Sequence, residues 1–183
     1  CEEVACRREN PVAPTPSPSV RKDRSEGERP LVTFALFTYN QEKYISEAVQ
    51  SALSQTYEPL EIILSDDCST DRTFSIMKQE VEKYDGPHHV VLRENHENLG
   101  LENHINKVWS VSRGEWIVMA AGDDLSAATR VKEIMDAVQL FPDVHLVSSR
   151  IRTLHTSQRN EKSIPEGSSE QIKIYTMQDF LNK

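Results

Sequence analysis

The run Leu31-Val32-Thr33-Phe34-Ala35-Leu36-Phe37 decides the fold of this chain. It is almost entirely apolar or β-branched, which is typical of a strand that is covered on both faces. The apolar positions that follow it have the spacing of a helix with one buried stripe: Ile45, Ala48, Val49, Ala52 and Leu53. A buried strand followed by an amphipathic helix predicts an α/β unit.

The same alternation continues to about residue 150. Apolar runs predict further strands at residues 60–64, 90–92, 116–120 and 144–147. Helical stripes predict further helices at residues 74–84, 101–109 and 131–138. Strands that alternate with helices of this length form right-handed crossover units. We therefore predict an α/β fold with a mostly parallel central sheet that is flanked by helices.

The segments on either side of this region differ from it in composition. Residues 1–30 contain five prolines and few apolar side chains, which predicts a disordered leader. Residues 31–150 form the predicted folded domain. Residues 151–183 begin with a polar stretch that is typical of a hairpin or loop, and a helix is expected from Met177. The chain stops at Lys183 inside that expected helix, so we expect the last region to be incomplete.

Composition narrows the possible functions. The 183 residues carry a net charge of -8, which argues against broad binding to nucleic acid. No apolar run approaches the roughly 18 residues that a transmembrane helix needs, although peripheral association with a membrane stays open. Three cysteines do not make a disulfide framework, and no signal peptide follows Cys1. These features predict a cytoplasmic protein, either free or at the cytoplasmic face of the membrane.

Polar clusters follow three of the predicted strands. They are Thr38-Tyr39-Asn40, the segment from Ser65 to Asp71, and Gly122-Asp123-Asp124. Ligands of open parallel sheets bind beyond the carboxyl ends of the strands. The three clusters therefore predict one shared site, in which the two adjacent aspartates suit a divalent cation and the phosphates it carries.

Each cluster also has a purely structural explanation. Asp67, Ser69 and Thr70 could cap a helix that begins near Asp71. Asp123 and Asp124 could cap a helix around residues 126–140, although one oxygen is enough for a cap and two adjacent carboxylates repel each other. The histidines have no convincing metal-ligand spacing and are expected at the surface: His88, His89, His96 and His104. No P-loop or G-x-G-x-x-G motif is present in the sequence.

The motifs of this chain resemble those of the family 2 glycosyltransferases, the inverting enzymes of GT-A fold that use nucleotide sugars. The matching segments are Val32 to Glu42, Ser54-Gln55-Thr56-Tyr57, Glu61 to Thr73, Asn98-Leu99-Gly100, Gly114 to Ile117 and Ala121 to Asp124. The resemblance covers roughly residues 31–150, which would form the nucleotide-sugar-binding GT-A domain. Residues 151–183 would begin the acceptor-facing region.

The resemblance implies a role for each matching position. Tyr39 would lie against the nucleotide base, and Asp67 would accept a hydrogen bond from the imino N–H of uracil. Asp124 would ligate Mn²⁺ or Mg²⁺, and Asp123 would lie beside the ribose and the water shell of the metal. The implied nucleotide-binding set is Thr38, Tyr39, Asn40, Glu42, Asp66, Asp67, Asn98, Gly100 and Asp123.

The implied reaction is metal-dependent transfer of a sugar from a nucleotide donor, with UDP expected, to an acceptor hydroxyl with inversion. The metal would stabilise the diphosphate leaving group. A general base is needed as well, and we expect it beyond Lys183. The acceptor stays open between a glycan, a lipid-linked molecule and a protein, with cell-surface polysaccharide synthesis as the expected setting. Two alternatives remain, a non-catalytic nucleotide-sugar-binding module and, less favoured, a nucleotidyltransferase.

Overall fold

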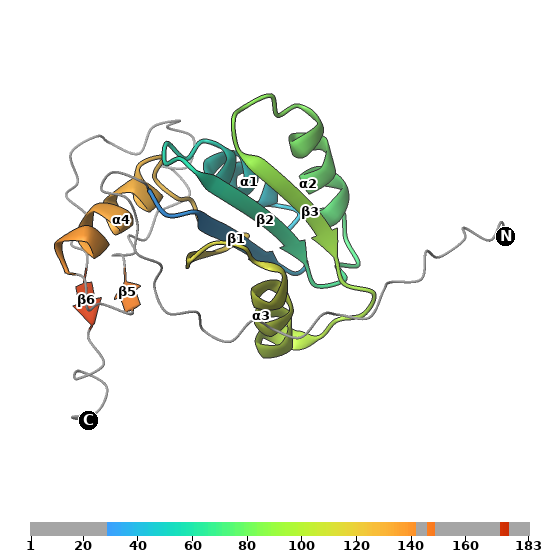
Figure 1. The fold of residues 1–183 in the computed structure, drawn as a ribbon. Helices are drawn as coiled ribbons and strands as arrows, with labels where there is room; N and C mark the ends of the chain where they lie inside the picture. Colours follow the sequence, from blue (N-terminus) through green and yellow to red (C-terminus); the bar gives the residue numbers. More distant parts are fainter. Residues whose placement is uncertain (1–28, 142–145, 149–172, 176–183) are drawn as a thin grey trace, which may run out of the picture.

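A four-stranded parallel sheet forms the centre of the molecule (Figure 1). The structure, a computed structural model, describes residues 29–141, 146–148 and 173–175. The strands lie in the order β3-β2-β1-β4. Their bounds are β1 (Val32–Thr38), β2 (Leu60–Asp66), β3 (His89–Glu94) and β4 (Trp116–Ala121). The prediction of an α/β fold with a parallel sheet is confirmed.

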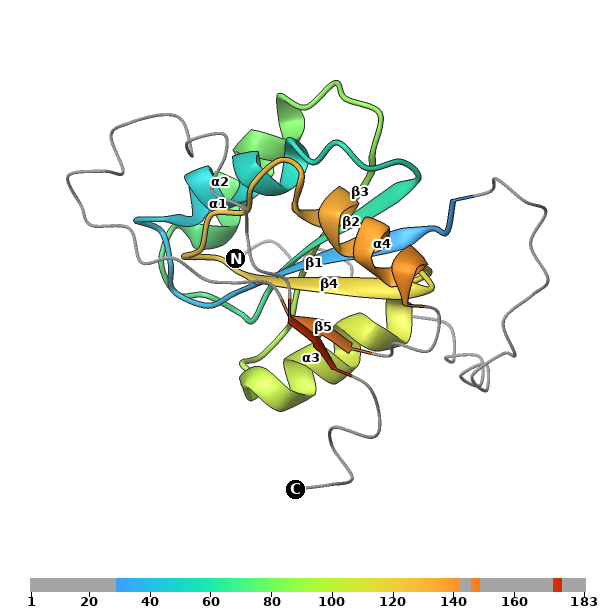
Figure 2. The ribbon, with the colours of Figure 1, turned by 90° about the vertical axis from the view of Figure 1, so that its left-hand side faces the viewer.

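Helices cover both faces of this sheet. Figure 2 shows α1, α2 and α4 on one face and α3 on the other. Their bounds are α1 (Ile45–Leu53), α2 (Thr73–Glu82), α3 (Gly100–Val111) and α4 (Arg130–Leu140). From β1 to β3 the chain advances in one direction, and it then returns past β1 to place β4. Because parallel crossovers are right-handed, this reversal moves α3 to the opposite face.

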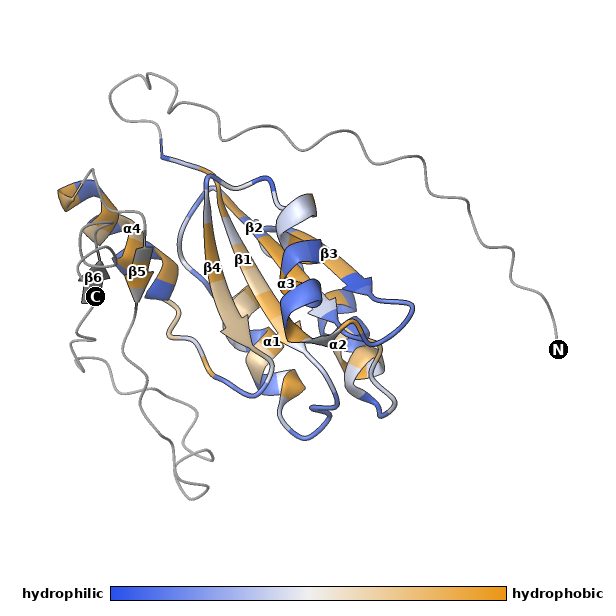
Figure 3. Ribbon diagram, turned by 90° about the horizontal axis from the view of Figure 1, so that it is seen from below, coloured by the Kyte–Doolittle hydropathy of each residue, from blue (hydrophilic) through white to orange (hydrophobic). Residues whose placement is uncertain are grey.

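The side chains of β1 alternate between two apolar clusters. Phe34 and Leu36 point into the larger cluster, which is packed against α1. Ala35 and Phe37 belong to the smaller cluster, which contains Val108 of α3. All seven residues of β1 are buried, as the uninterrupted apolar run predicts. Figure 3 shows the contrast between the largely hydrophobic strands and the mostly hydrophilic ribbon of α3, although Leu101 and Trp109 of this helix are exposed.

An ion pair between the buried Glu61 and the partly exposed Arg113 lies at the amino-terminal end of the sheet. Glu61 accepts hydrogen bonds from Arg113 Nε at 2.6 Å, from Arg113 N at 3.0 Å and from Thr33 Oγ1 at 2.8 Å. Burial raises the pKa of Glu61, but the hydrogen bonds from Arg113 and Thr33 and the charge of Arg113 outweigh it and hold this pKa below its ordinary 4.5. Gly114 N donates to Thr33 Oγ1 at 2.9 Å. A Cβ at Gly114 would lie 2.7 Å from the same hydroxyl oxygen, so no larger residue fits without movement.

The region after α4 differs from the prediction. β5 (Leu146–Ser148) pairs antiparallel with β6 (Lys173–Tyr175) in a separate two-stranded sheet. The strand predicted at residues 144–147 is present over Leu146 and Val147 within the described residues, but it lies outside the parallel sheet, and β6 was not predicted. An apolar run indicates a strand but does not specify its partner.

Other expectations lie largely outside the described residues. They concern the leader at residues 1–28, the polar stretch within residues 149–172 and the helix expected from Met177. Pro30, the last residue of the expected leader, is buried, and its carbonyl accepts a hydrogen bond from Tyr57 Oη at 2.7 Å. Among the described helices, none is long and apolar enough to cross a membrane.

Candidate functional site

The three polar clusters meet at the carboxyl ends of β1, β2 and β4. Asp67 N donates to Thr38 O at 2.9 Å, which joins the ends of β2 and β1. Gly122 N donates to Phe37 O at 2.8 Å, which joins the end of β4 to the other side of β1. The strand order reverses between β1 and β4, and open α/β sheets bind ligands at such a switch point. The structure thus brings the predicted clusters together.

Gly122 allows the loop after β4 to approach the end of β1 closely. A Cβ at Gly122 would lie 2.7 Å from Thr38 Oγ1 and would also collide with Gln41 Oε1. These two side chains hydrogen-bond to each other, with Thr38 Oγ1 donating to Gln41 Oε1 at 2.8 Å. A side chain at residue 122 would therefore push the loop, and with it Asp123 and Asp124, away from β1.

Asp123 and Asp124 lie on an exposed turn. Asp124 N donates to Ala121 O at 3.1 Å, which closes the turn directly after β4. The helix for which the pair was considered as a cap begins only at Arg130, with Thr129 at its N-cap position. Capping of α4 therefore does not explain the two carboxylates, and the expected helix start around residue 126 is too early by four residues.

The donor set of this turn fits a hard divalent cation. Exposed carboxylate oxygens are the ligands that Mg²⁺ and Mn²⁺ prefer. Such ions often take only one or two protein carboxylates and complete their shell with phosphate and water. Within the described residues, no group of three or more His, Cys, Asp or Glu side chains is placed to hold a metal. Among the described residues, a cation in this turn would therefore be held by Asp123 and Asp124 together with its own ligand.

The loop after β1 is bound to the loop after β2 by reciprocal hydrogen bonds. Asn40 has a positive φ of 51°, and its backbone N donates to Ser69 Oγ at 2.8 Å. In return, Asn40 Oδ1 accepts from Thr70 N at 2.8 Å. Glu42 Oε2 likewise accepts from Arg72 N at 3.1 Å. The side-chain oxygens of Asn40 and Glu42, which were predicted to bind nucleotide, thus connect the two loops.

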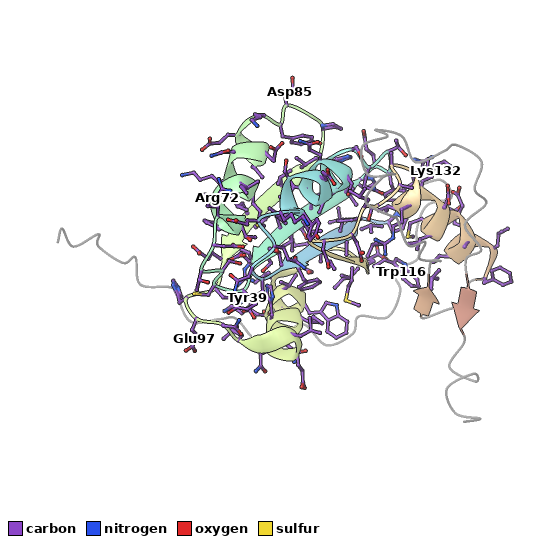
Figure 4. The ribbon with its side chains drawn as sticks, turned by 180° about the vertical axis from the view of Figure 1, so that it is seen from behind. Tyr39, Arg72, Asp85, Glu97, Trp116 and Lys132 are labelled. Carbon is purple, nitrogen blue, oxygen red and sulfur yellow. The ribbon has the colours of Figure 1, made fainter. Side chains whose placement is uncertain are left out.

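Tyr39 lies on this loop and is 44% exposed. Figure 4 shows it toward the same end of the sheet as Glu97, whereas Trp116, at the start of β4, lies toward the opposite end. An aromatic ring that keeps almost half its surface in solvent beside a loop of polar residues can stack against a flat ligand. The position is compatible with the predicted contact to a base.

Asp66 and Asp67 have different surroundings although they are adjacent. Asp66 is fully buried, and its carboxylate accepts hydrogen bonds from Ser69 N at 2.7 Å and Ser69 Oγ at 2.6 Å. Asp66, which was predicted to bind nucleotide, therefore shapes the loop after β2. The predicted cap by Asp67, Ser69 and Thr70 is not observed, because α2 begins at Thr73 and Thr73 N bonds to Asp71 Oδ1 at 2.8 Å.

Asp67 instead faces the amino terminus of α3. Its Oδ1 accepts from Asn95 Nδ2 at 2.7 Å and from Leu99 N at 3.0 Å. Its Oδ2 accepts from Gly100 N at 3.0 Å. A carboxylate oxygen can accept about two hydrogen bonds. These contacts leave Oδ2 with one further acceptor position for a donor such as an imino N–H.

Asn98 and Gly100 shape the turn that enters α3. Gly100 has a φ of 74°, a conformation that favours glycine, and it is the first residue of the helix. Asn98 Oδ1 accepts from Gly100 N at 3.0 Å. Both residues therefore border the carboxylate of Asp67, and their observed contacts are internal to the protein.

Two histidines that were expected at the surface are buried, and their contacts were not predicted. His88 and His104 are buried, at 9% and 2% exposure, whereas they were expected at the surface. His88 Nε2 lies 2.7 Å from Gln55 O, and His104 Nε2 lies 2.6 Å from Ser65 Oγ. For His104 a signal existed, because it precedes Val108 by one helical turn on the buried stripe of α3. Arg93 and Asn95, which connect His104 to Asp67, carried no such signal.

Comparison with known proteins places the fold in a family. The family model described as Glycosyl transferase family 2 matches residues 33–182. EpsE of Bacillus subtilis (strain 168), a provisionally assigned glycosyltransferase, is 36% identical over 104 residues, which cover 57% of this chain and 37% of EpsE. The chain thus spans little more than a third of the length of this curated relative.

Two solved structures have the same fold over 69% of this chain and 37% of their own. The mannosyltransferase PcManGT from Pyrobaculum calidifontis, in complex with GDP-Man and Mn²⁺, is 27% identical with a TM-score of 0.59. S. aureus TarS 1-349, in complex with UDP-GlcNAc, is 27% identical with a TM-score of 0.55. These similarities confirm the predicted GT-A fold, and the family match, which extends over most of the chain, shows that this protein belongs to glycosyl transferase family 2.

Proposed function

We propose that the carboxyl edge of the sheet binds the nucleoside diphosphate of a sugar donor, with UDP as the nucleotide and Mn²⁺ or Mg²⁺ as the cofactor. The observation that carries the proposal is the close contact at Gly122, which brings the Asp123-Asp124 turn beside Thr38 at the switch point of the sheet. The nucleotide-sugar complexes of PcManGT and TarS support it.

The described residues divide the work of donor binding. Tyr39 offers an exposed ring to the base, and Asp67 Oδ2 offers an acceptor to its imino hydrogen. Asp124 and Asp123 would hold the cation. A divalent cation bound there would neutralise the charge that grows on the diphosphate as the glycosidic bond breaks.

Five of the predicted nucleotide-binding residues take a supporting role in this proposal. Their polar groups bind other parts of the protein, so they set the shape of the loops around the donor. These residues are Asn40, Glu42, Asp66, Asn98 and Gly100. The backbone of Thr38 joins β1 to Asp67 and would line the same pocket.

The complete protein, on this proposal, transfers the sugar to an acceptor hydroxyl with inversion. We assign no general base among the described residues. The acceptor is left open, and a cytoplasmic location on the donor side of a cell-surface glycan pathway is part of the proposal. A non-catalytic nucleotide-sugar-binding module is the second candidate, because binding of a donor by the described residues does not itself require a general base.

Isothermal titration calorimetry tests the donor site. We expect one UDP to bind per chain in the presence of Mn²⁺ and the affinity to fall strongly when the metal is chelated. GDP in place of UDP tests the choice of base, because guanine also carries an imino N–H but is larger. Absence of metal-dependent binding of either nucleotide would refute the proposal.

A transfer assay separates the two candidates. Purified chain is incubated with Mn²⁺ and radiolabelled UDP-sugars, and release of the free sugar is measured. Hydrolysis of the donor above the rate without protein would support an enzyme. Binding of UDP without release of the sugar would favour the binding module.

A further inference from the structure

A continuous chain of polar side chains connects Asp67 to His104 beneath α3. Asn95 Nδ2 donates to Asp67 Oδ1 at 2.7 Å, and Arg93 Nη2 donates to Asn95 Oδ1 at 2.7 Å. Arg93 Nη1 donates to Ser65 Oγ at 2.6 Å, and Ser65 Oγ lies 2.6 Å from His104 Nε2. Arg93 is half-buried and the other four residues are buried. Such a network is costly to leave partly satisfied, so its members fix one another.

Arg93 determines which way the amide of Asn95 points. A guanidinium can only donate hydrogen bonds, so the group that faces it must be the amide oxygen. The amide nitrogen of Asn95 is therefore turned toward the acceptor Asp67. Without Arg93 the amide could rotate and present its oxygen to the carboxylate, which would repel it. The geometry of Asp67 thus depends on a residue that does not touch it.

Ser65 and His104, at the other end of this network of side chains, hold Arg93 in place. Ser65 and Arg93 are paired in register on β2 and β3. The hydroxyl of Ser65 accepts from Arg93, so its single hydrogen is available to a neutral His104. The pKa of His104 lies below its ordinary 6.5, mainly because the ring is buried. The charge of Arg93 lowers this pKa further, and the charges of Asp67 and Asp66 offset only part of the decrease. A neutral imidazole is the form that this arrangement needs.

Capping of α3 does not require this network of polar side chains. The amides of Leu99 and Gly100 already bind the two oxygens of Asp67, which satisfies the helix terminus. The additional bond from Asn95 reaches Oδ1 only, so that Oδ1 has two donors and Oδ2 has one. The consequence is a carboxylate of fixed rotation with its open acceptor position on Oδ2.

We propose that Asn95, Arg93 and His104 are positioning residues for the nucleoside: they orient Asp67 so that Oδ2 accepts the imino hydrogen of the base. The proposal rests on the proposed function, because it assigns the base to Asp67. It predicts that these residues affect recognition of the base and leave the metal-diphosphate end of the site unchanged.

A double-mutant cycle measured by calorimetry tests the proposal. Asn95→Ala should lower the affinity for UDP with Mn²⁺ about tenfold, because a hydrogen bond to a charged group is lost. The affinity for Mn²⁺-pyrophosphate, which has no base, should stay within about twofold of that of the unaltered chain. In an Asp67→Ala background, Asn95→Ala should cause no further loss of UDP affinity, since the two residues act through one contact.

A control variant and a conservative variant distinguish a loss of UDP binding from a loss of folding. Asn103→Ala removes an exposed amide that bonds to Leu99 O on α3 and should not alter UDP affinity. Arg93→Lys keeps the charge but loses the forked donor geometry, and it should lower UDP affinity less than Asn95→Ala does. Circular dichroism and thermal melting establish that each variant is folded.

Each remaining outcome overturns the inference. Equal losses of UDP and pyrophosphate affinity in Asn95→Ala would make the network merely structural, and additive losses in the double variant would mean that Asn95 acts independently of Asp67. If the unaltered chain binds pyrophosphate with Mn²⁺ but not UDP, the base assignment fails and the inference with it. If it binds neither, the proposed function itself fails.

Discussion

The two ends of the parallel sheet use similar groups to opposite effect. At the amino-terminal end, Glu61 receives three hydrogen bonds, of which one comes from the guanidinium of Arg113. At the carboxyl end, Asp67 also receives three hydrogen bonds, but every donor is a neutral amide. Glu61 is paired directly with a cationic side chain, whereas the donors that hold Asp67 in place carry no charge. We call the amino-terminal end, where Glu61 pairs with Arg113, the closed end of the sheet. The carboxyl end is the one that we propose binds a ligand.

The glycines at the two ends of β4 repeat this contrast. Gly114 packs against Thr33 beside the closed end, and Gly122 packs against Thr38 beside the exposed Asp123-Asp124 turn. Both sites exclude a Cβ for the same steric reason. The contact at Gly122 holds the Asp123-Asp124 turn in place, whereas the contact at Gly114 holds only the closed end. Substitutions at both glycines can therefore separate effects on stability from effects on ligand binding.

The largest expected effect comes from the metal-binding turn. Asp124→Asn removes a charged ligand from the proposed cation site, and we expect the affinity for UDP with Mn²⁺ to fall by about a hundredfold. Asp136→Asn is the matched control, because Asp136 is an exposed carboxylate on α4 that pairs only with Lys132, one helical turn before it, in the interactions that the structure describes. Calorimetry on both variants decides the point. Normal binding by Asp124→Asn would show that the cation site is elsewhere.

The two glycines test whether close packing serves different ends of the sheet. Gly122→Ala and Gly114→Ala should each cost about 1–3 kcal/mol of unfolding free energy, because the added methyl meets atoms 2.7 Å away. Only Gly122→Ala should also lower UDP affinity, by roughly tenfold, since it displaces the Asp123-Asp124 turn. Urea unfolding and calorimetry on the same samples measure the two effects.

The opposite pattern would contradict this explanation. Loss of UDP affinity in Gly114→Ala, measured where the variant is still folded, would mean that the amino-terminal end also affects the ligand. Unchanged affinity in Gly122→Ala would mean that the turn tolerates displacement.

A change at the closed end should affect stability alone. Glu61→Gln removes the charge that pairs with Arg113 but keeps an acceptor for Thr33, and we expect a loss of about 1–2 kcal/mol in unfolding free energy. Arg113 is 58% exposed, which limits the cost because water can solvate the unpaired guanidinium. UDP affinity should not change. A fall in affinity beyond about twofold would argue against independent ends.

As the pH falls, we expect His104 at the carboxyl end to lower the unfolding free energy before Glu61 at the amino-terminal end does. This is the smallest of the expected effects. The pKa of His104 is lowered from 6.5, mainly by burial, so the unfolded chain binds more protons than the folded chain as the pH falls below 6.5. Stability should therefore decrease in this range, by no more than about 1.4 kcal/mol per pH unit. The pKa of Glu61 lies below 4.5, so its contribution is lost only at lower pH.

His104→Gln is the variant that isolates this effect. Its amide oxygen can accept from Ser65 but does not titrate, so the slope of unfolding free energy between pH 6.5 and 4.5 should become smaller. Urea unfolding at a series of pH values measures the slope. An unchanged slope would assign the acid sensitivity to another group.

Most of the fold could be predicted because the signals are local. The apolar run at residues 31–37 and the helical stripe from Ile45 to Leu53 correspond to β1 and α1 with shifts of at most one residue. The partner of β5 could not be predicted, since strand pairing depends on contacts between distant segments. The start of α4 was placed too early for a related reason, because residues 125–129 form an irregular connection although their composition does not exclude a helix.

The site was predictable in position and less so in detail. Strand ends predicted the meeting of Thr38, Asp67 and the Asp123-Asp124 turn, because parallel strands end at one edge. The internal contacts of Asn40 could not be predicted, since they require a positive φ and a facing loop. The contact between Arg93 and Asn95 depends on side-chain orientation across two elements, which leaves no periodic pattern in the sequence.

Paramagnetic broadening by Mn²⁺ tests the difference between the two ends most directly. The chain is labelled with ¹⁵N, saturated with UDP and titrated with small amounts of Mn²⁺, and the loss of each backbone amide signal is recorded. Our account predicts the strongest broadening at Gly122, Asp123 and Asp124, strong broadening at Thr38, and much weaker effects at Gly114. Broadening that is centred on Gly114, or spread evenly over the sheet, would contradict it.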